Sequence, residues 1–495
     1  MSFKQEIFYF IVQQLIMSKE KEFEINKNKD FSKWYLKVLR KAEIIDDRFP
    51  AKGMYVYSWY GLDLIKKCIS ILELLLKVHK HKEERYPTLI PYSVFMKEKK
   101  FFEGFQGEAY LVTKTLKKEL DEPLILRPTS ETAMYYMWSM WIRSYAQLPL
   151  KIFQTVNIFR CESKMTRPLL RLREVIFFNE AHTAHATKEE AEEQIKEAIE
   201  IYRKFFDDLL IPYLIIKTPK WDTFAGALYN YDFLTVLPDG KTLELGSVIN
   251  LGQNFGKAFD IKFQDKDGKK KYVWQTCYGI AERVVGALIS IHGDNKGLRL
   301  PFEIAPIQIV IIPILKKDEE KEILNYCENI KNKLSKFRVL LDESERTPGE
   351  KFNIWELKGV PIRIEIGLRE VKNNEITISR RDIKERIKLK INELERVEEI
   401  GKEITKNLKK EAKKWFEGRI KYAENLEELK KNIKEGFVKI PFCSIDENGK
   451  KCAEKLKEIC EIVGTLYPEE NKPINKKCLV CGKEAKVYVY ACRSY

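Results

Sequence analysis

Apolar positions recur at helical spacing in several parts of the chain. Between residues 58 and 84 they fall three or four residues apart, which predicts an amphipathic helix, at Leu62, Ile65, Ile69, Leu72 and Leu76. A second helix is predicted from Thr187 to about Leu210, because Thr187-x-x-Glu190 forms a capping box. Strand candidates lie around these helices at 152–156, 175–178 and 272–274. Helices and strands do not alternate regularly here, which favours an antiparallel sheet with helices packed around it.

Residues 306–385 follow a different pattern. Strands are predicted at 307–312, 337–341 and 362–366, with a charged helix at 316–335 between the first two. Strands separated by helices indicate a small α/β domain. The chain is therefore expected to be α+β, with one domain at 18–305 and a second at 306–385.

The third expected domain, 386–495, opens with a helix that carries apolar residues on one face: Ile391, Leu394, Val397, Ile400, Ile404 and Leu408. Its other face is densely charged, as most solvated helix faces are. Six of the ten cysteines follow within the last 53 residues.

Composition narrows the function classes. The formal charge is +15, and a basic excess of this size favours a polyanionic partner such as a nucleic acid. The alternative is a chain that is simply rich in lysine throughout. Apolar residues make up 44% of the 495 positions, enough for more than one core.

No apolar run approaches the roughly 20 residues of a membrane span. The stretch from Ile7 to Met17 is short and lacks a small-residue cleavage site, so it is a poor signal peptide, and Met17 is a candidate start. A cytoplasmic location is expected. Ten cysteines are too few for a disulfide scaffold and should stay reduced there.

One short motif points to phosphate chemistry. Arg160 and Glu162 in Phe159-Arg-Cys-Glu162 would point to the same side of a strand, and a basic segment ending at Arg173 follows. Attack on a phosphate builds up charge that a fixed guanidinium fork stabilises better than a lysine does. On its own, this motif is weak and is more typical of a surface ion pair.

Five sequence segments that occur together and in a set order favour phosphate chemistry over a surface ion pair. The chain resembles the prolyl-tRNA synthetases of the archaeal and eukaryotic kind, which are class II aminoacyl-tRNA synthetases, over nearly its whole length. The resemblance is carried by Pro128–Glu131, by 159–171 (motif 2), by Asn179–His185, by Leu251–Phe259 and by Tyr278–Arg283 (motif 3). Pro91 matches the motif 1 proline, which in this class lies at a homodimer interface.

The resemblance implies a ligase that joins L-proline to tRNA(Pro) with ATP and Mg²⁺. A secondary ammonium needs acceptors, and its ring needs an apolar wall. The implied proline contacts are Thr129, Glu131, Arg160, Phe178, Glu180 and His182. His182 would either bind substrate or orient Glu180. Its spacing to His185 is not interpreted as a metal site, because no third ligand is near in the sequence.

Arg160 and Arg283 are the expected catalytic residues, on the α- and γ-phosphates. The implied ATP contacts are Arg160, Glu162, Arg171, Leu172, Glu244, Ser247, Gln275, Thr276 and Arg283. One segment departs from the family, which places Gln, Thr and His where Glu244, Ser247 and Ile249 stand. Isoleucine cannot supply a contact that histidine makes in relatives.

The interval between motifs 2 and 3 is too short for an inserted editing domain. A small pocket separates ligands by only about 1–3 kcal/mol per methylene, so Ala or Cys should be activated at low rates. By resemblance the second domain binds the anticodon, with candidates Lys351, Glu356, Arg363 and Arg369.

Two cysteine pairs near the end predict a structural zinc site with ligands Cys443, Cys452, Cys478 and Cys481. The first pair is widely spaced, so Cys460 or Cys492 could replace one ligand. Four thiolates leave no open position for catalysis. By resemblance the terminal Tyr495 packs back towards the catalytic domain.

Two alternatives remain open. A class II synthetase for threonine, serine or glycine would share the fold, although threonyl enzymes use an active-site zinc whose His and Cys ligands are not seen around Glu131 and Glu180. A non-catalytic tRNA-binding paralogue is the other. The presence of Arg160, Glu131 and Arg283 argues against it.

Overall fold

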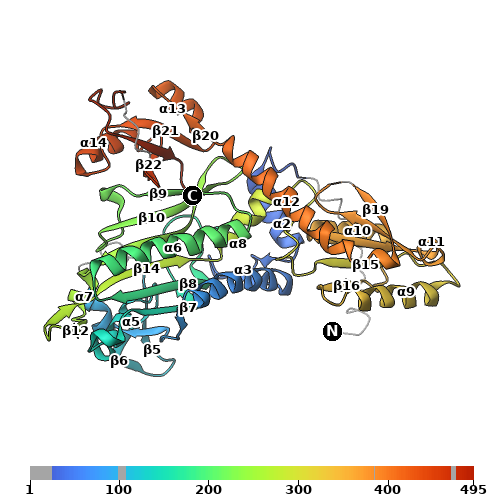
Figure 1. Cartoon of the computed structure of the whole chain (residues 1–495), viewed down its shortest axis with the longest axis horizontal. Coiled ribbons are helices and arrows are strands. Elements are labelled where there is room, and N and C mark those ends of the chain that lie inside the picture. Colours follow the sequence, from blue (N-terminus) through green and yellow to red (C-terminus); the bar gives the residue numbers. More distant parts are fainter. Residues whose placement is uncertain (1–24, 99–107, 384, 470–474) are drawn as a thin grey trace.

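The computed structural model describes residues 25–98, 108–383, 385–469 and 475–495. The segment from Ile7 to Met17, and with it the expected start at Met17, lies outside these residues. A large lobe built on one long sheet and a smaller lobe are arranged side by side (Figure 1). Within the described residues, no helix combines the length and the apolar character needed to cross a membrane.

The large lobe contains an eleven-stranded sheet among the described residues. Neighbours are antiparallel except at its two ends, where β20 runs parallel to β21 and β3 parallel to β7. In spatial order the strands are β20 (Ile420–Tyr422), β21 (Phe437–Phe442), β23 (Val487–Cys492), β22 (Glu461–Leu466), β9 (Leu214–Lys217), β10 (Tyr229–Val236), β11 (Thr242–Gly252), β14 (Trp274–Ile280), β8 (Glu174–His185), β7 (Leu150–Phe159) and β3 (Lys82–Glu83).

Three helices cover one face of this sheet: α3 (Trp59–Val78), α6 (Lys188–Asp208) and α8 (Arg283–His292). The predicted cap of α6 is present, since the Thr187 hydroxyl accepts from the Glu190 amide at 3.2 Å. The Glu190 carboxylate reaches one residue further than a capping box requires and accepts from the Ala186 amide at 2.9 Å. On the opposite face lie α5 (Glu131–Trp141) and α7 (Asn254–Ala258), whose apolar sides share a core with Ala184 and Cys277.

The predicted strands at 152–156 and 175–178 lie inside β7 and β8. The expected strand at 272–274 is instead the junction between β13 (Lys270–Tyr272) and β14. The remaining elements of this lobe and the tail are α2 (Phe31–Lys41), β1 (Ile45–Asp46), β2 (Val56–Tyr57), β4 (Leu89–Pro91), α4 (Tyr92–Phe95), β5 (Tyr110–Lys114), β6 (Glu119–Leu126), β12 (Lys262–Gln264), α13 (Leu426–Asn432) and α14 (Glu447–Leu456).

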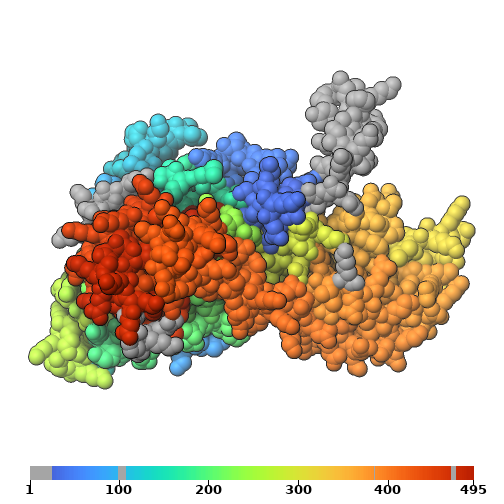
Figure 2. All heavy atoms as spheres, turned by 90° about the horizontal axis from the view of Figure 1, so that it is seen from above, coloured from blue at the N-terminus to red at the C-terminus, as the bar shows by residue number. Residues whose placement is uncertain are grey.

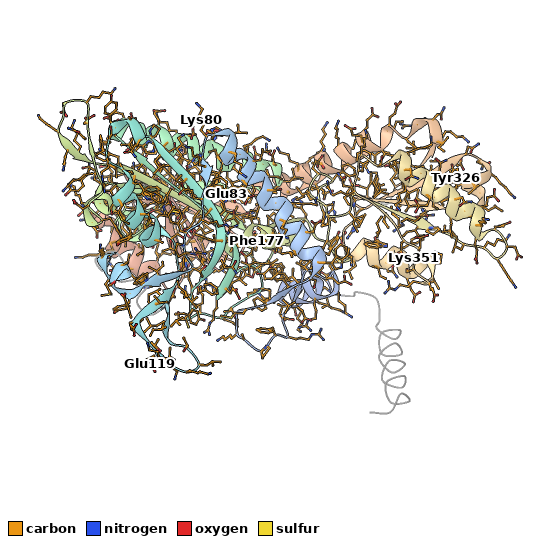
Figure 3. All side chains as sticks on the ribbon, turned by 90° about the horizontal axis from the view of Figure 1, so that it is seen from below. Lys80, Glu83, Glu119, Phe177, Tyr326 and Lys351 are labelled. Atoms are coloured by element: carbon orange, nitrogen blue, oxygen red, sulfur yellow. The ribbon has the colours of Figure 1, made fainter. Side chains whose placement is uncertain are left out.

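The smaller lobe is the predicted α/β unit. Its five strands, in spatial order, are β16 (Val339–Leu341), β15 (Ile309–Pro313), β17 (Ile362–Ile366), β18 (Glu375–Arg380) and β19 (Arg386–Lys390). Its helices are α9 (Glu320–Lys333), α10 (Pro348–Leu357) and α11 (Leu368–Lys372). Tyr326 and Lys351 mark this lobe in Figure 3, whereas Glu83 and Phe177 lie in the large lobe.

The expected boundary at 385/386 is wrong, because β19 pairs with β18 and completes the sheet of the smaller lobe. The helix that follows, α12 (Arg396–Glu417), also packs its apolar face into that lobe's core through residues such as Ile400 and Leu408. Ile391 lies in a short 3₁₀ turn before this helix.

The tail is joined to the large sheet. Strand β22 pairs with β9 through Thr465 and Lys217, so the last 76 residues extend the same sheet from its edge. Phe416, near the end of α12, packs against Phe437 of the tail. Figure 2 shows the tail in red lying against the large lobe. The expected third domain is therefore divided between the two lobes.

Candidate active site

A cavity of about 210 Å³ lies on the α5 side of the sheet, over β8, β11 and β14. The strand register sets its floor: Glu180 lies opposite Gly279, and His182 lies opposite Cys277. Ser247 of β11 lies opposite Gly279 on the next strand. Antiparallel pairing thus brings polar groups that are distant in sequence onto one face.

The start of α5 forms the wall above this floor. Glu131 is the first residue of the helix, and its carboxylate accepts a hydrogen bond from the Thr129 hydroxyl. Both side chains are buried. The two residues therefore present acceptors to the cavity, as a bound secondary ammonium requires.

Glu180 is held in its ionised form by neighbours. It accepts hydrogen bonds from the Ser130 hydroxyl and from the Gln154 amide, the latter at 3.0 Å, and His182 Nε2 lies 3.5 Å away. Burial opposes ionisation, but these donors, His182 foremost, keep the pKa of Glu180 below its ordinary value. The Tyr135 hydroxyl holds the other His182 nitrogen at 2.9 Å. His182 therefore orients Glu180, the second of the two roles expected for it.

Phe178 lines the cavity rather than the core. Its ring lies beneath the Arg160 guanidinium, 5.6 Å from centroid to Cζ. A methyl group on Gly279 would come within 3.1 Å of this ring, so the bare glycine keeps space above Phe178. The ring gives this cavity an apolar wall.

Two arginines separate this cavity from a second one of about 320 Å³. Arg160 Nε donates to the Pro128 carbonyl at 3.0 Å, which fixes the guanidinium between the two spaces. Burial, and then the positive charge of Arg283, lower the pKa of Arg160, although a guanidinium stays charged in proteins. Two half-buried cations held together in this way favour a polyanion between them.

A buried carboxylate fixes Arg283. This arginine begins α8, and the preceding Glu282 accepts from the Tyr57 hydroxyl at 2.9 Å and from the Ile176 and Phe177 amides at 3.1 Å each. These bonds attach the start of α8 to β8. Sequence analysis missed Glu282, which is charged but buried.

The second cavity is lined by Arg160, Glu162, Arg171, Leu172, Glu244 and Arg283, all expected at ATP. The Arg171 guanidinium lies 3.4 Å from the Glu162 carboxylate and also donates to the Tyr495 main-chain oxygen. The Tyr495 hydroxyl donates to Asp239 at 2.7 Å and accepts from Arg167 at 3.0 Å. The expected return of Tyr495 to the large lobe is thus seen.

Three family models match the chain in order. The model described as "tRNA synthetase class II core domain (G, H, P, S and T)" matches residues 110–292. "Anticodon binding domain" matches residues 308–400, and "Prolyl-tRNA synthetase, C-terminal" matches residues 426–495. A proline–tRNA ligase from Methanopyrus kandleri is 46% identical over 94% of this chain and 96% of its own length. The chain belongs to the prolyl-tRNA synthetase family.

Solved structures agree with this assignment. Giardia lamblia prolyl-tRNA synthetase in complex with prolyl-adenylate superposes with a TM-score of 0.91 at 35% identity, covering 95% of this chain and all of that one. The Cryptosporidium parvum enzyme complexed with halofuginone and AMPPNP gives a TM-score of 0.89 at 32% identity, covering 95% of this chain and 99% of that one. The class II fold expected from the sequence is confirmed.

Two residues expected at ATP lie elsewhere in this prolyl-tRNA synthetase fold. Thr276 points to the opposite face of β14, where its hydroxyl bonds Thr183 at 2.6 Å. Gln275 faces the cavity side but lies under α7, close to Gly256, and does not line either cavity. Neither position fits the expected contact.

Asp232, a carboxyl group that the sequence did not single out, lies beside Ser247 and Glu244, in the segment where this chain departs from the family. Ser247 donates to Asp232 at 2.7 Å and to Glu244 at 3.1 Å. Burial, together with the nearby Glu244 charge, raises the pKa of Asp232 to about 7. Asp232 and Glu244 both line the second cavity, while Ile249 lines the first.

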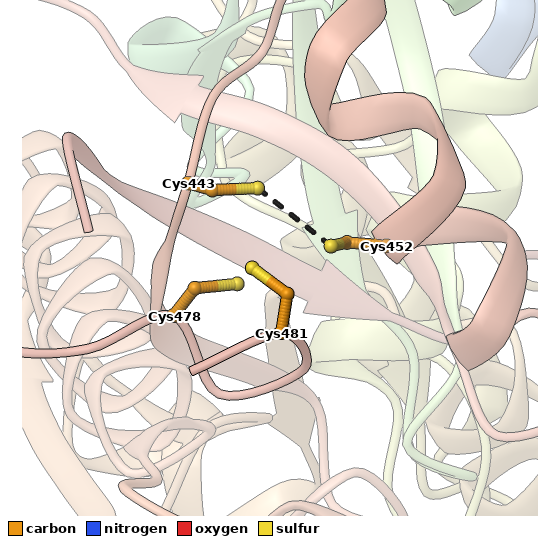
Figure 4. Close-up of side chains that lie close together, drawn as sticks. All are labelled: Cys443, Cys452, Cys478 and Cys481. Carbon is orange, nitrogen blue, oxygen red and sulfur yellow. Dashed lines mark hydrogen bonds between the residues drawn. The ribbon is translucent and has the colours of Figure 1, made fainter. Parts of the chain in front are cut away.

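The four predicted cysteines come together in the tail (Figure 4). Their sulfur atoms all lie within 4.8 Å of one another, and the Cys443 and Cys452 sulfurs are 3.7 Å apart. Tetrahedral Zn²⁺ with bonds near 2.3 Å separates its sulfur ligands by about 3.8 Å, so the donors fit zinc. Cys460 lies in the apolar core and Cys492 bonds the Thr242 hydroxyl at 3.0 Å, so neither replaces a ligand here.

The four expected anticodon residues separate into two kinds. Lys351 is buried and donates to the Asp342 carbonyl at 2.8 Å, so it supports the lobe's interior and does not face a ligand. Glu356 pairs with Lys296 of the large lobe at 2.7 Å. Arg363 stacks on Phe352 at 4.2 Å and pairs with Glu365, while Arg369 is exposed on α11. Of these four residues, Arg369 is the exposed one, while Arg363 and Glu356 are half-buried in ion pairs.

Proposed function

We propose that this chain joins L-proline to tRNA(Pro) in two steps at the two connected cavities. The carboxylate of proline attacks the α-phosphorus of ATP, and pyrophosphate leaves. The terminal adenosine hydroxyl of the tRNA then attacks the carbonyl of prolyl-adenylate, and AMP leaves. The observation that carries this proposal is Arg160, which lies between the acceptor-lined cavity and the second, arginine-lined one in a chain of this family.

The first cavity suits proline. Glu131 and Thr129 accept the two N–H bonds of its ammonium, with Glu180, oriented by His182, as a further acceptor. Phe178 covers the pyrrolidine ring. The volume of about 210 Å³ leaves little room for a larger side chain.

The second cavity suits the nucleotide. Arg160 stabilises the charge that develops at the α-phosphate, and Arg283 binds the γ-phosphate end. Glu162, Arg171, Leu172 and Glu244 complete its surroundings, whereas Ser247, also expected at ATP, lines the first cavity. Bound Mg²⁺ would neutralise phosphate charge, with Glu162 and Glu244 as the nearest candidate oxygen ligands. The chain supplies positioning and charge stabilisation, without a covalent protein intermediate.

The deciding experiment is ATP–pyrophosphate exchange with each standard amino acid. Stimulation by proline alone is expected at low concentration. Stimulation by threonine, serine or glycine instead would show another class II synthetase, and no stimulation by any amino acid would show a non-catalytic paralogue. At high concentration Ala and Cys should give weak exchange, and its absence for both would refute misactivation.

The same proposal includes tRNA contacts in the smaller lobe, a structural metal in the tail and a cellular location. Arg363 and Arg369 contact tRNA in the smaller lobe, and Zn²⁺ on the four tail cysteines is structural. The cytoplasm is the proposed location. Metal analysis tests the zinc: a Cys478→Ser/Cys481→Ser double variant should hold one equivalent less than wild type, and an unchanged zinc content would refute this ligand set.

We also propose a homodimer through the α3–β4 surface. Its exposed apolar side chains support this: Leu74, Val78, Leu89 and Tyr92 are 62%, 67%, 41% and 42% accessible. Light scattering should give twice the chain mass, and Val78→Lys should shift it to the monomer. An unchanged dimer in that variant would place the interface elsewhere.

A further inference from the structure

The first cavity holds a second set of metal-type donors. Among the described residues, one oxygen of Glu131, one ring nitrogen of His182 and the sulfur of Cys277 all lie within 4.8 Å of one another. All three side chains are buried. The sequence does not reveal this set, because the two other donors lie 51 residues before His182 and 95 residues after it.

The fold fixes two of these donors firmly. His182 and Cys277 face each other directly across β8 and β14, where opposite side chains are about 4.5–5.5 Å apart at Cβ. Glu131 begins α5 above them. The pairing therefore holds an imidazole and a thiol side by side, with a carboxylate closing the third side.

The surroundings of His182 resemble those of a metal-bound imidazole. Such a ring usually has its second nitrogen held by a hydrogen bond. Here the Tyr135 hydroxyl holds Nδ1 at 2.9 Å, so Nε2 is the nitrogen directed at the acidic side of the cavity. Glu180 lies 3.5 Å from Nε2 and offers a fourth donor.

The donor chemistry selects the metal. A thiol with an imidazole and carboxylates suits Zn²⁺ and its transition-metal neighbours, whereas Mg²⁺ prefers oxygen ligands alone. A tetrahedral zinc ion with bonds of about 2.0–2.3 Å needs its donors roughly 3.3–3.8 Å apart. The present spacing, within 4.8 Å, requires the donors to close by about one ångström at most.

We propose that the amino-acid cavity binds Zn²⁺ through Glu131, His182 and Cys277, in competition with proline. Zinc and the prolyl ammonium are both cations that need the same carboxylate, so they exclude each other. On binding, the Cys277 S–H bond breaks, the proton passes to solvent and an S–Zn bond forms. The competition rests on the proposed proline site, whereas metal binding does not.

Cobalt is the probe. The four tail cysteines are first filled with a single equivalent of Zn²⁺, which the four-thiolate site takes in preference to the cavity, and Co²⁺ is then titrated into the full-length protein. A thiolate-to-cobalt charge-transfer band is expected in wild type and in Cys161→Ser, a cysteine outside the donor set. In Cys277→Ser the band should vanish, and Co²⁺ affinity should fall at least about tenfold. A band that persists in Cys277→Ser, or that never forms, overturns the proposal.

Competition is tested with two enantiomers. L-proline and D-proline chelate free cobalt equally, so only binding to the protein distinguishes them. L-proline should suppress the band at concentrations where D-proline does not. Equal suppression by both would show that proline and metal do not share the cavity. Proline-dependent pyrophosphate exchange in metal-buffered solution is measured separately. The zinc proposal can therefore fail while the ligase function is supported, and the ligase function can fail while metal binding is supported.

Discussion

Arg160 is held by two contacts that only a guanidinium can make together. Its Nε donates to the Pro128 carbonyl, and its plane lies over Phe178. Lysine keeps the charge but loses the fork that matches phosphate oxygens. We therefore expect Arg160→Lys to lower kcat of proline-dependent pyrophosphate exchange by about 100-fold or more. Arg143→Lys, at an exposed guanidinium, is the control, and near-normal exchange in Arg160→Lys would contradict the assigned role.

Asp232 makes the stability of the folded chain depend on pH. Its pKa is about 7 when folded against an ordinary 3.8, so between these values the folded state holds a proton that the unfolded state lacks. Stability from this group is therefore full at low pH and declines as pH rises through about 7. Asp232→Asn should raise the melting temperature by a few degrees at pH 8 and by little at pH 4. Asp267→Asn, on an exposed turn, should show no such difference; an equal gain at both pH values for Asp232→Asn would refute the argument.

Single residues also show what the sequence could reveal. Glu131, Arg160, Phe178, Glu180 and Arg283 were found by their motifs, and all line the cavities. Strand alternation alone shows that Gln275 and Thr276 cannot both face one ligand. Cys277, Asp232 and Glu282 escaped detection, because their roles depend on partners brought close only by the folded sheet.

At the scale of elements, α8 depends on a close approach at its centre. A methyl group on Gly286 would come within 2.6 Å of Leu170 and 2.9 Å of the Tyr35 hydroxyl. Gly286→Ala should therefore destabilise the chain by about 1–3 kcal/mol, despite the better helix propensity of alanine, and raise KM for ATP by displacing Arg283. Chemical denaturation and exchange kinetics measure both effects.

Gly349 of α10 is the matched control, because a methyl group there meets nothing within 4 Å. Gly349→Ala should be neutral or slightly stabilising. A Gly286→Ala variant as stable as this control would show that α8 can shift to accept the methyl group.

Element types were predicted better than their limits. Helical spacing located α3 and α12, and a capping box located α6, but α12 begins at Arg396, ten residues after the expected start of its domain. The short strand β19 alternates charged residues with Ile387 and Leu389, which is typical of a strand, but its membership in the smaller sheet is set by pairing with β18, and the alternation does not reveal that partner.

At the scale of the whole molecule, an arginine of the smaller lobe forms an ion pair with an aspartate of the large lobe. Arg381 of the smaller lobe donates to both carboxylate oxygens of Asp294 at 2.8 and 2.6 Å. Arg381→Gln should leave pyrophosphate exchange within about twofold, because the cavities are remote, but raise KM for tRNA about tenfold by loosening the lobes.

Lys296→Gln breaks only a single ion pair between the lobes, with Glu356 at 2.7 Å, and should have a small effect on charging. Kinetics of exchange and of aminoacylation, measured on the same preparations, separate the two steps. An Arg381→Gln enzyme with normal KM for tRNA would show that the relative position of the lobes does not limit charging.

The edge pairing of β22 with β9 has a consequence for heating and for metal loss. Because the tail and the large lobe share one continuous sheet, neither can melt without exposing strand edges of the other. They should unfold in a single calorimetric transition. Zinc held by the four tail cysteines would then raise the melting point of the catalytic sheet itself, by mass action on the shared folded state.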